Sequence, residues 1–156
     1  MNIFLSKYLN KIDVKGRVSI PASYRTTLAA ENFSGIIVYP SFKNNCIEAC
    51  SMSRLEELSR MIQTLDPYSD ERDAFETIVL GEAISLQFDN EGRVTLPFGL
   101  TSGVGITTQA CFVGKGLVFE IWNPVDFEEY LKSARLLAQG NRSFLKNKNE
   151  SFRGGQ

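Results

Sequence analysis

The sequence predicts an α+β protein built from two similar halves with flanking helices. The main observation is a repeat: the stretch Asp13–Pro21 recurs as Asp89–Pro97, an offset of 76 residues, and both copies fit Asp-x-x-Gly-Arg-Val-x-Ile/Leu-Pro. The second observation is that short apolar stretches typical of strands, followed by a segment of helical period, come after each copy in the same order. A repeat of this length marks a duplicated structural unit. We therefore expect one architecture used twice.

The composition indicates an ordinary globular chain. It has 156 residues, of which 43% are hydrophobic and 22% charged, enough to bury a core. No apolar run is long enough for a membrane span. The first twelve residues contain lysines and lack a cleavage-like site, so we expect no signal peptide and a cytoplasmic location.

Several function classes are disfavoured by what the sequence lacks. It contains three cysteines, no Cys-x-x-Cys and no histidine. This disfavours a zinc site and removes the commonest general base. Gly-rich nucleotide loops and catalytic carboxylate pairs at a telling spacing are also missing. The sequence predicts no enzyme activity, no cofactor, no metal and no small-molecule substrate, and it predicts reduced, buried cysteines.

Charge is distributed unevenly along the chain although its net value is only −1. Residues 1–25 carry five Lys or Arg against one acid, and residues 135–156 carry five against one. Residues 53–91 carry three bases against ten acids, which is typical of a solvated helical surface. Basic ends are compatible with nucleic-acid binding.

In the first half, the order of expected elements is strand, turn, strand, helix, strand, strand. The expected ranges are 3–9 for the first strand, 13–16 for the turn, 17–20 for the second strand, 22–28 for the helix after Pro21, and 36–39 and 46–50 for the last two strands. Alternation of polar and apolar residues predicts the second strand, and proline suits the start of the helix. The second half repeats this order, with strands at 110–113 and 118–122.

Longer helices are expected after each half. Ser53 has the spacing of an N-cap, with Glu56 three residues on, and Asp66-Pro67 ends that helix. The apolar face consists of Leu55, Leu58, Met61, Ile62 and Leu65. A further helical segment begins near Asp70, with Phe75, Ile78 and Val79 on one side. In the second half Asn123 is the expected N-cap and Pro124 the first helical residue; its apolar face consists of Phe127, Tyr130, Leu131, Ala134 and Leu137.

The repeated motif itself is the candidate functional site. Asp13 and Asp89 can accept backbone N–H bonds, and Gly16 and Gly92 suit the positive φ of a tight turn. Each turn leads to an arginine, Arg17 or Arg93, whose planar fork suits phosphates and guanine edges. Lys15 and Arg25 add positive charge near the first copy. The alternative is structural: each arginine pairs with the preceding Asp and locks the turn.

The doubled motif resembles the MraZ family of bacterial transcription regulators, which is related to AbrB-type DNA-binding domains. The resemblance covers residues 3 to 138 and includes Phe4-Leu5-Ser6, the stretch Pro21–Arg25, and Phe119–Trp122 followed by a helix. It implies two tandem AbrB-like β-rich halves of the swapped-hairpin or double-psi-like barrel kind. These halves are 1–60 and 81–139, with a helical linker at 61–80 and a basic disordered tail at 140–156.

The resemblance also implies a function. Family members are cytoplasmic and nucleoid-associated, form rings, and bind direct repeats in double-stranded promoter DNA, usually as repressors of their own division and cell-wall operon. The DNA-contacting residues implied are Arg17 and Arg93, with Lys15 and Arg25 as helpers. Asp13, Gly16, Asp89 and Gly92 would shape the turns that present them.

The two halves of this chain differ at positions that matter for binding. The position equivalent to Arg25 in the second half is Thr101, where many relatives carry a basic residue. The position equivalent to Lys15 is Glu91. The helix expected after Pro97 is also weakened by Gly99, Gly103 and Gly105. We therefore expect Arg17 to contribute more to DNA binding than Arg93.

Two other functions fit the same residues. The chain could be an oligomeric structural or protein-interaction module without specific DNA binding, in which Phe75, Ile78, Phe127 and Tyr130 pack subunits. It could also be a small-ligand sensor on the same fold. Salt dependence separates DNA binding from the first of these, because phosphate contacts release counterions.

Overall fold

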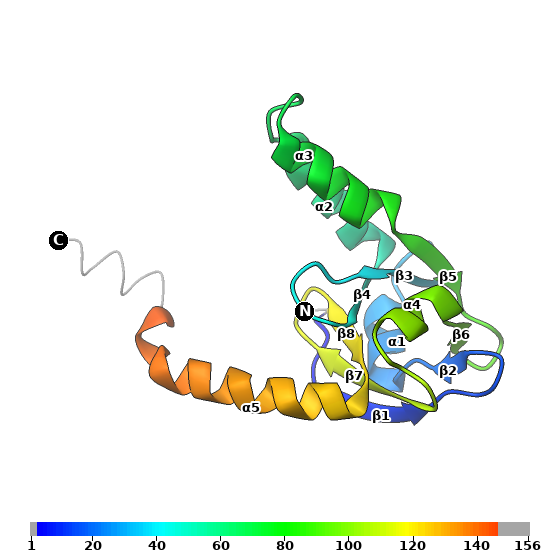
Figure 1. Cartoon of the computed structure of the whole chain (residues 1–156). Helices are drawn as coiled ribbons and strands as arrows, with labels where there is room; N and C mark the ends of the chain where they lie inside the picture. Colours follow the sequence, from blue (N-terminus) through cyan, green and yellow to red (C-terminus); the bar gives the residue numbers. More distant parts are fainter. Residues whose placement is uncertain (1–2, 147–156) are drawn as a thin grey trace. The chain divides into compact units, whose positions relative to one another are not determined.

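The computed structural model describes residues 3–146, and the α+β class is confirmed (Figure 1). The eight strands among these residues are β1 Lys7–Lys11, β2 Arg17–Ser19, β3 Gly35–Pro40, β4 Ile47–Cys50, β5 Ile84–Gln87, β6 Arg93–Thr95, β7 Gln109–Gly114 and β8 Phe119–Trp122. The helices are α1 Ala22–Leu28, α2 Met52–Gln63, α3 Asp70–Phe75, α4 Phe98–Gly103 and α5 Pro124–Gly140, with a π-helix η1 at Glu76–Gly81 and a 3-10 helix η2 at Arg142–Phe144. Of the described residues, 3–124 form one compact body and 125–146 form a second unit.

The main sheet of the body shows that the two sequence halves exchange strands. Its order is β1-β7-β8-β4-β3-β5, and every neighbouring pair is antiparallel. The first strand of each half pairs with a strand of the other half: β1 pairs with β7, and β5 pairs with β3. The central pair is β4 and β8, in which Glu48 lies opposite Glu120. The sheet order therefore reads the same from both ends when equivalent strands are exchanged.

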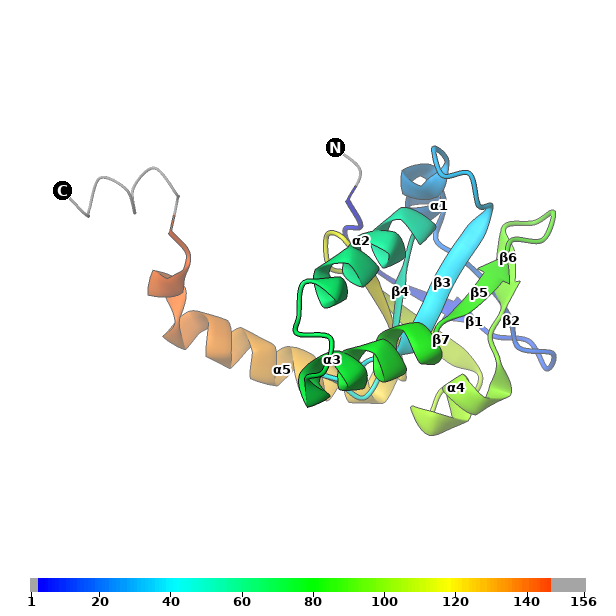
Figure 2. The same cartoon turned by 90° about the horizontal axis from the view of Figure 1, so that it is seen from above.

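A second, two-stranded ribbon joins the two copies of the repeat. Strands β2 and β6 pair antiparallel, with Arg17 opposite Thr95, Val18 opposite Val94 and Ser19 opposite Arg93. The turns that precede the two strands protrude from the same side of the body (Figure 2). Since both strands belong to the repeated motif, the two copies of the motif pair directly with each other.

The core lies between the ribbon, the main sheet and α1. Val18 and Val94 turn their side chains inward and are 1% exposed. They join a cluster of buried side chains, which includes Ile20, Tyr24, Ile36, Val38, Ile47, Phe112, Phe119 and Ile121. Alternation along β3 explains how it serves two layers, because Ile36 and Val38 face this cluster while Ile37 and Tyr39 face α2 and η1.

Helix α2 differs from the sequence prediction in two details. The N-cap of α2 is Ser51, whose hydroxyl accepts the Arg54 N–H at 3.1 Å, whereas Ser53 donates its hydroxyl to Glu31 instead. Met61 was expected on the apolar face but is 54% exposed. Ile62 is buried, and Leu55 and Leu58 pack against the same cluster, so the predicted apolar face is confirmed at these three residues.

The predicted start near Asp70 is confirmed, since Ser69 caps α3 there. Arg72 then donates to the Leu65 carbonyl at 3.2 Å, which ties α3 to the segment that follows α2. After Phe75 the helix widens into η1, of which Val79 is the buried member. The apolar side expected here is therefore only partly inward, because Phe75 and Ile78 remain 37% and 38% exposed.

The prediction of a strand over residues 3–9 is wrong at both ends. Ser6 has a φ of 71°, which interrupts the extended backbone, so β1 begins only at Lys7 and continues to Lys11. Phe4 forms an isolated bridge to Gly116 and buries its ring in the core. The segment before Ser6 thus anchors the chain without being part of β1.

Helix α1 occupies the predicted range, and α4 forms despite its glycines. Thr101, Val104 and Ile106 are buried, and this burial holds the segment against the core. Within residues 3–146 no helix has the length and apolar character needed to cross a membrane.

The C-terminal unit contains α5, which starts at Pro124 as expected, and η2. The predicted disordered tail 140–156 is helical at its beginning, because α5 includes Gly140 and η2 covers Arg142–Phe144; residues 147–156 lie outside the described part. Phe127 is buried, but Leu137, expected on the apolar face, is 69% exposed.

Candidate nucleic-acid interface

The first turn is built around the carboxylate of Asp13. Its Oδ1 accepts the backbone N–H groups of Lys15 at 3.0 Å and Arg17 at 2.9 Å, and its Oδ2 accepts Nε–H of Arg17 at 2.6 Å. The Gly16 N–H closes the turn on the Asp13 carbonyl at 3.0 Å. Gly16 has a φ of 84°, a conformation that favours glycine. Asp, Gly and Arg of the motif are therefore parts of one hydrogen-bonded unit.

The second turn repeats this arrangement bond for bond. Asp89 accepts the N–H groups of Glu91 at 2.8 Å and Arg93 at 3.0 Å, and its Oδ2 accepts Nε–H of Arg93 at 2.9 Å. Gly92, with a φ of 75°, donates its N–H to the Asp89 carbonyl at 3.1 Å. The identical residues of the repeat thus have identical local roles.

These bonds perturb the ionisation of both carboxyl groups in the same direction. The backbone N–H of Arg17, and that of Arg93 in the second turn, stabilise the charged carboxylate most strongly. They hold the pKa values of Asp13 and Asp89 below the ordinary value of 3.8. The side-chain bond to Asp89 also raises the pKa of Arg93. Each turn therefore keeps a carboxylate and a guanidinium charged side by side.

Both interpretations of the arginines have a counterpart in this geometry. Nε of each arginine locks the turn, as the structural alternative expects. The terminal Nη groups differ: among residues 3–146 those of Arg17 have no hydrogen bond or ion pair, whereas Nη2 of Arg93 lies 3.7 Å from Glu91. A locked Nε leaves the outer edge of the Arg17 fork available for a ligand.

The ribbon brings the two arginines onto one face. Residues opposite each other in an antiparallel pair point to the same side, and so do residues two apart along a strand. Arg17, Ser19, Arg93 and Thr95 therefore share one face, while Val18 and Val94 occupy the buried one. Sequence reasoning identified the arginines but missed Ser19 and Thr95 as their neighbours. The polar–apolar alternation in each copy was the signal for them.

The two copies are also fastened to each other by backbone bonds. The Ile20 N–H donates to the Gly92 carbonyl at 3.2 Å, and the Leu96 N–H donates to the Gly16 carbonyl at 2.9 Å. Each turn is thus held by the strand end of the other copy. This places both Asp-x-x-Gly-Arg units in one site.

The two predicted helper residues have different surroundings. Lys15 is exposed at the tip of the first turn. Arg25 is half-buried, donates Nε–H to the Ile20 carbonyl at 3.1 Å, and packs its guanidinium against Gly92, where an added Cβ would lie 2.6 Å from Nη1. Arg25 therefore supports the second turn, although it belongs to the first half.

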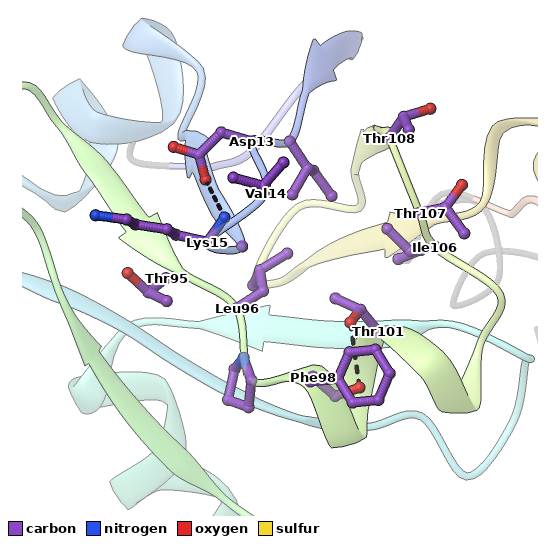
Figure 3. Close-up of a pocket in the computed structure, with 13 residues that line it drawn as sticks. Asp13, Val14, Lys15, Thr95, Leu96, Phe98, Thr101, Ile106, Thr107 and Thr108 are labelled. Carbon is purple, nitrogen blue, oxygen red and sulfur yellow. Dashed lines mark hydrogen bonds between the residues drawn. The ribbon is translucent and has the colours of Figure 1, made fainter.

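A cavity of about 500 Å³ lies beside the first turn (Figure 3). It is lined by the turn itself, by the start of α4 and by the loop before β7. Val14 and Phe98, which are 103% and 82% exposed, stand at its rim. Neither the cavity nor the position of Arg25 could be read from the order of residues, because both depend on contacts between the halves.

The duplicated glutamates are structural in this fold. Glu120 is 3% exposed; it accepts Nε1–H of Trp122 at 2.9 Å and pairs with Lys115 at 3.1 Å. Glu48 accepts the hydroxyl of Tyr39. Within residues 3–146 neither carboxylate forms a hydrogen bond or an ion pair with an arginine. In that part no three His, Cys, Asp or Glu side chains gather as metal ligands, and the three cysteines are free and buried.

Taken together, the strand-exchanged α+β body and its paired Asp-x-x-Gly-Arg turns define a protein of two pseudo-symmetric halves joined through a duplicated turn motif. The family model described as "MraZ protein, putative antitoxin-like" matches residues 79–147. The proteins named "Transcriptional regulator MraZ" from Rickettsia bellii (strain OSU 85-389) and Rickettsia akari (strain Hartford) are 61% and 59% identical to the chain, over 150 and 149 residues. Each alignment covers 96% of this chain and 100% of the relative. The chain belongs to the MraZ family of transcriptional regulators.

Proposed function

We propose that the chain is a sequence-specific DNA-binding repressor that binds promoter direct repeats as a homo-oligomeric ring. The observation that carries the proposal is the exposed face of the β2–β6 ribbon, on which Arg17 and Arg93 stand diagonally across the pair. A two-stranded ribbon fits the major groove of DNA, and an arginine fork can bind a guanine edge with two bonds. The operator that the family resemblance suggests lies upstream of the chain's own division and cell-wall operon, which would place the protein on the nucleoid.

Unequal contributions follow from the contacts of the two arginines. The outer edge of Arg17 is available and Lys15 stands beside it, while Glu91 lies 3.7 Å from Nη2 of Arg93. An approaching phosphate is attracted to the first turn and repelled by Glu91 at the second. The proposal therefore assigns the larger share of binding to Arg17.

Assembly into a ring would compensate for the small number of cations in one copy. Linked copies raise the effective concentration of each later contact along repeated sites. The C-terminal unit exposes large apolar side chains, which supports a role in contacts between copies: Leu136, Leu137, Phe144 and Leu145 are 71%, 69%, 81% and 90% exposed. No catalytic step is part of the proposed function.

The test is a fluorescence-anisotropy titration of a duplex from upstream of the gene against a scrambled duplex, at two salt concentrations. Arg17→Ala should weaken binding to the upstream duplex by roughly tenfold to a hundredfold, as expected for about 1–3 kcal/mol per bidentate base contact. Arg93→Ala should weaken it less. Arg60→Ala, which removes an exposed arginine on α2 away from the ribbon, is the matched control and should bind as the wild type does.

The outcomes separate the competing functions. Binding that weakens steeply with salt indicates phosphate contacts. Equal affinity for both duplexes would contradict sequence specificity. If assembled protein binds neither duplex at low salt, the DNA proposal fails and a protein-interaction module becomes the better explanation.

A further inference from the structure

Each turn of the repeat lies near the short helix of the other half, but only the second turn is contacted by a long side chain from that helix. At the second turn, Arg25 of α1 reaches Gly92: its Nε donates to the Ile20 carbonyl at 3.1 Å, and its guanidinium lies over the glycine. The residue equivalent to Arg25 in the second half is Thr101 of α4. Its side chain is too short to reach the first turn, and its hydroxyl donates to the Phe98 carbonyl at 3.2 Å instead.

The hydrogen-bond acceptor that Arg25 uses has a counterpart at the first turn. The residue equivalent to Ile20 is Leu96, which is 3% exposed. Its carbonyl oxygen lies 2.9 Å from the place where a Cβ on Gly16 would be, which is the side of the turn that Arg25 covers in the other copy. Among residues 3–146 no hydrogen bond to this oxygen is formed. Because Leu96 lines the cavity beside the first turn, its carbonyl oxygen can accept a hydrogen bond from a ligand there.

The cavity beside the first turn is larger than its counterpart beside the second turn, about 500 Å³ against about 370 Å³, and Arg25 lines only the second. Gly16, Leu96 and Thr101 all line the first cavity, and these are the equivalents of Gly92, Ile20 and Arg25. Its other walls include the apolar side chains of Val14, Phe98 and Ile106, which can contact the methylene groups of a ligand. In Figure 3 the ammonium end of Lys15 points away from Thr107 and Thr108, to the far side of the turn.

The geometry points to a ligand site: the cavity bounded by Gly16, Leu96 and Thr101 accepts an alkylguanidinium cation, which takes the place that Arg25 takes at the second turn. One N–H of the cation donates to the Leu96 carbonyl, its plane lies over Gly16, and its alkyl part contacts Phe98 and Ile106. The Asp13 carboxylate also lines the cavity but is already paired with Arg17, so recognition of the cation depends on the Leu96 carbonyl and the apolar walls. A bound cation would brace the first turn as Arg25 braces the second.

The experiment is an NMR titration of the full chain with ethylguanidinium chloride, with ethylammonium chloride at equal ionic strength as the control for charge alone. We expect saturable shifts of the Gly16, Leu96 and Thr101 amide signals with ethylguanidinium only. The matched variants are Thr101→Arg, which should fill the site with the chain's own arginine and abolish the saturable shifts, and Arg25→Thr, which should create a second such site with saturable shifts at Gly92.

Two sources share this chemistry, a free alkylguanidinium compound and an arginine of a second copy of the chain. Dilution of the protein without the probe distinguishes them, because only the second source makes the Gly16 and Leu96 signals depend on protein concentration. The inference is overturned if the shifts are linear in probe concentration, if ethylammonium produces them equally, or if folded Thr101→Arg protein keeps them. A crystal structure of Thr101→Arg with the new guanidinium away from Leu96 would also overturn it. None of these readouts involves DNA.

Discussion

Val18 and Val94, which occupy the same position in the two copies of the repeat, lie directly opposite each other in the β2–β6 ribbon. A residue that pairs with its own equivalent must lie near an axis of two-fold pseudo-symmetry. Glu48 and Glu120 pair in the same way at the centre of the main sheet. The axis therefore runs through both the ribbon and the sheet, and it relates the two Asp-x-x-Gly-Arg turns.

The first prediction concerns the cost of removing the valines on this axis. Each is 1% exposed, so Val18→Ala and Val94→Ala should each lower the free energy of unfolding by about 2 kcal/mol, from two lost methyl groups and the space they leave. The two costs should be similar because the environments are related by the pseudo-symmetry. Urea unfolding measures them.

The double variant provides a stricter check of the pairing. Because the side chains are cross-strand neighbours, the two costs should not add, and a double-mutant cycle should give a coupling of about 0.5 kcal/mol or more. Val14→Ala is the control, since this valine is fully exposed and its loss should change stability by less than about 0.5 kcal/mol. Strict additivity would argue against direct contact of the pair.

The parts of the fold that local sequence determines were predictable. Helix α1 follows from Pro21 and its helical residues, and each turn follows from Asp and Gly at fixed spacing. The prediction failed where one backbone dihedral or one of two nearby serines decided the outcome, as with Ser6 before β1 and Ser51 at the start of α2. Neither choice changes the hydrophobic period from which the elements were predicted.

The site was predictable only within each copy of the motif. The repeat identified Arg17 and Arg93 but not that antiparallel pairing puts both on one face. The support of Gly92 by Arg25 joins residues far apart in the sequence and depends on how the halves fold together. Such contacts have no local signal, so the cavity beside Thr101 needed the structure.

A second prediction compares the two turn glycines. Alanine is strained at both, since φ is 84° at Gly16 and 75° at Gly92. At Gly16 the new Cβ would lie 2.9 Å from the Leu96 backbone oxygen, whereas at Gly92 its nearest neighbours are side-chain atoms of Arg25, which can move. Gly16→Ala should therefore destabilise the protein more than Gly92→Ala, each by at least about 1 kcal/mol.

Removing the Arg25 side chain, which an added Cβ on Gly92 would meet, checks the role of this contact. In an Arg25→Ala background, Gly92→Ala should cost less than in the wild type, while Gly16→Ala should cost the same. Gly99→Ala is the control, because no atom lies within 4 Å of its added Cβ and alanine favours the helix α4. Thermal unfolding of the set suffices; an equal cost of Gly92→Ala in both backgrounds would contradict the contact with Arg25.

A third prediction concerns thiol reactivity. Burial raises the pKa of Cys50 to about 12 and raises that of Cys46 as well. Because the thiolate is the reactive form, the native protein should react with a thiol-specific disulfide reagent at pH 8 at least tenfold more slowly than the protein in denaturant. All three cysteines should react in the unfolded chain. Rapid reaction of Cys50 in folded protein would contradict its burial.

The last prediction is the pH dependence of the turn carboxylates. The folded pKa values of Asp13 and Asp89 lie below the ordinary value of 3.8, so the unfolded chain binds protons more readily at these groups. Their stabilisation is therefore fully present above the unfolded pKa and is lost as the pH falls through the lower folded pKa. The difference in free energy of unfolding between wild type and Asp89→Asn should be constant near neutrality and should shrink below about pH 4.

The cause of the shift can be tested with the neighbouring arginine. The backbone N–H of Arg17 acts most strongly on Asp13, and the Arg17 side chain acts less. Arg17→Gln keeps that backbone group, so the acid dependence attributable to Asp13 should persist in this variant with a smaller amplitude. Urea unfolding of Arg17→Gln and Arg17→Gln/Asp13→Asn between pH 2.5 and pH 7 measures it. If the dependence disappears in the Arg17→Gln background, the guanidinium and not the turn backbone holds the carboxylate in its charged form.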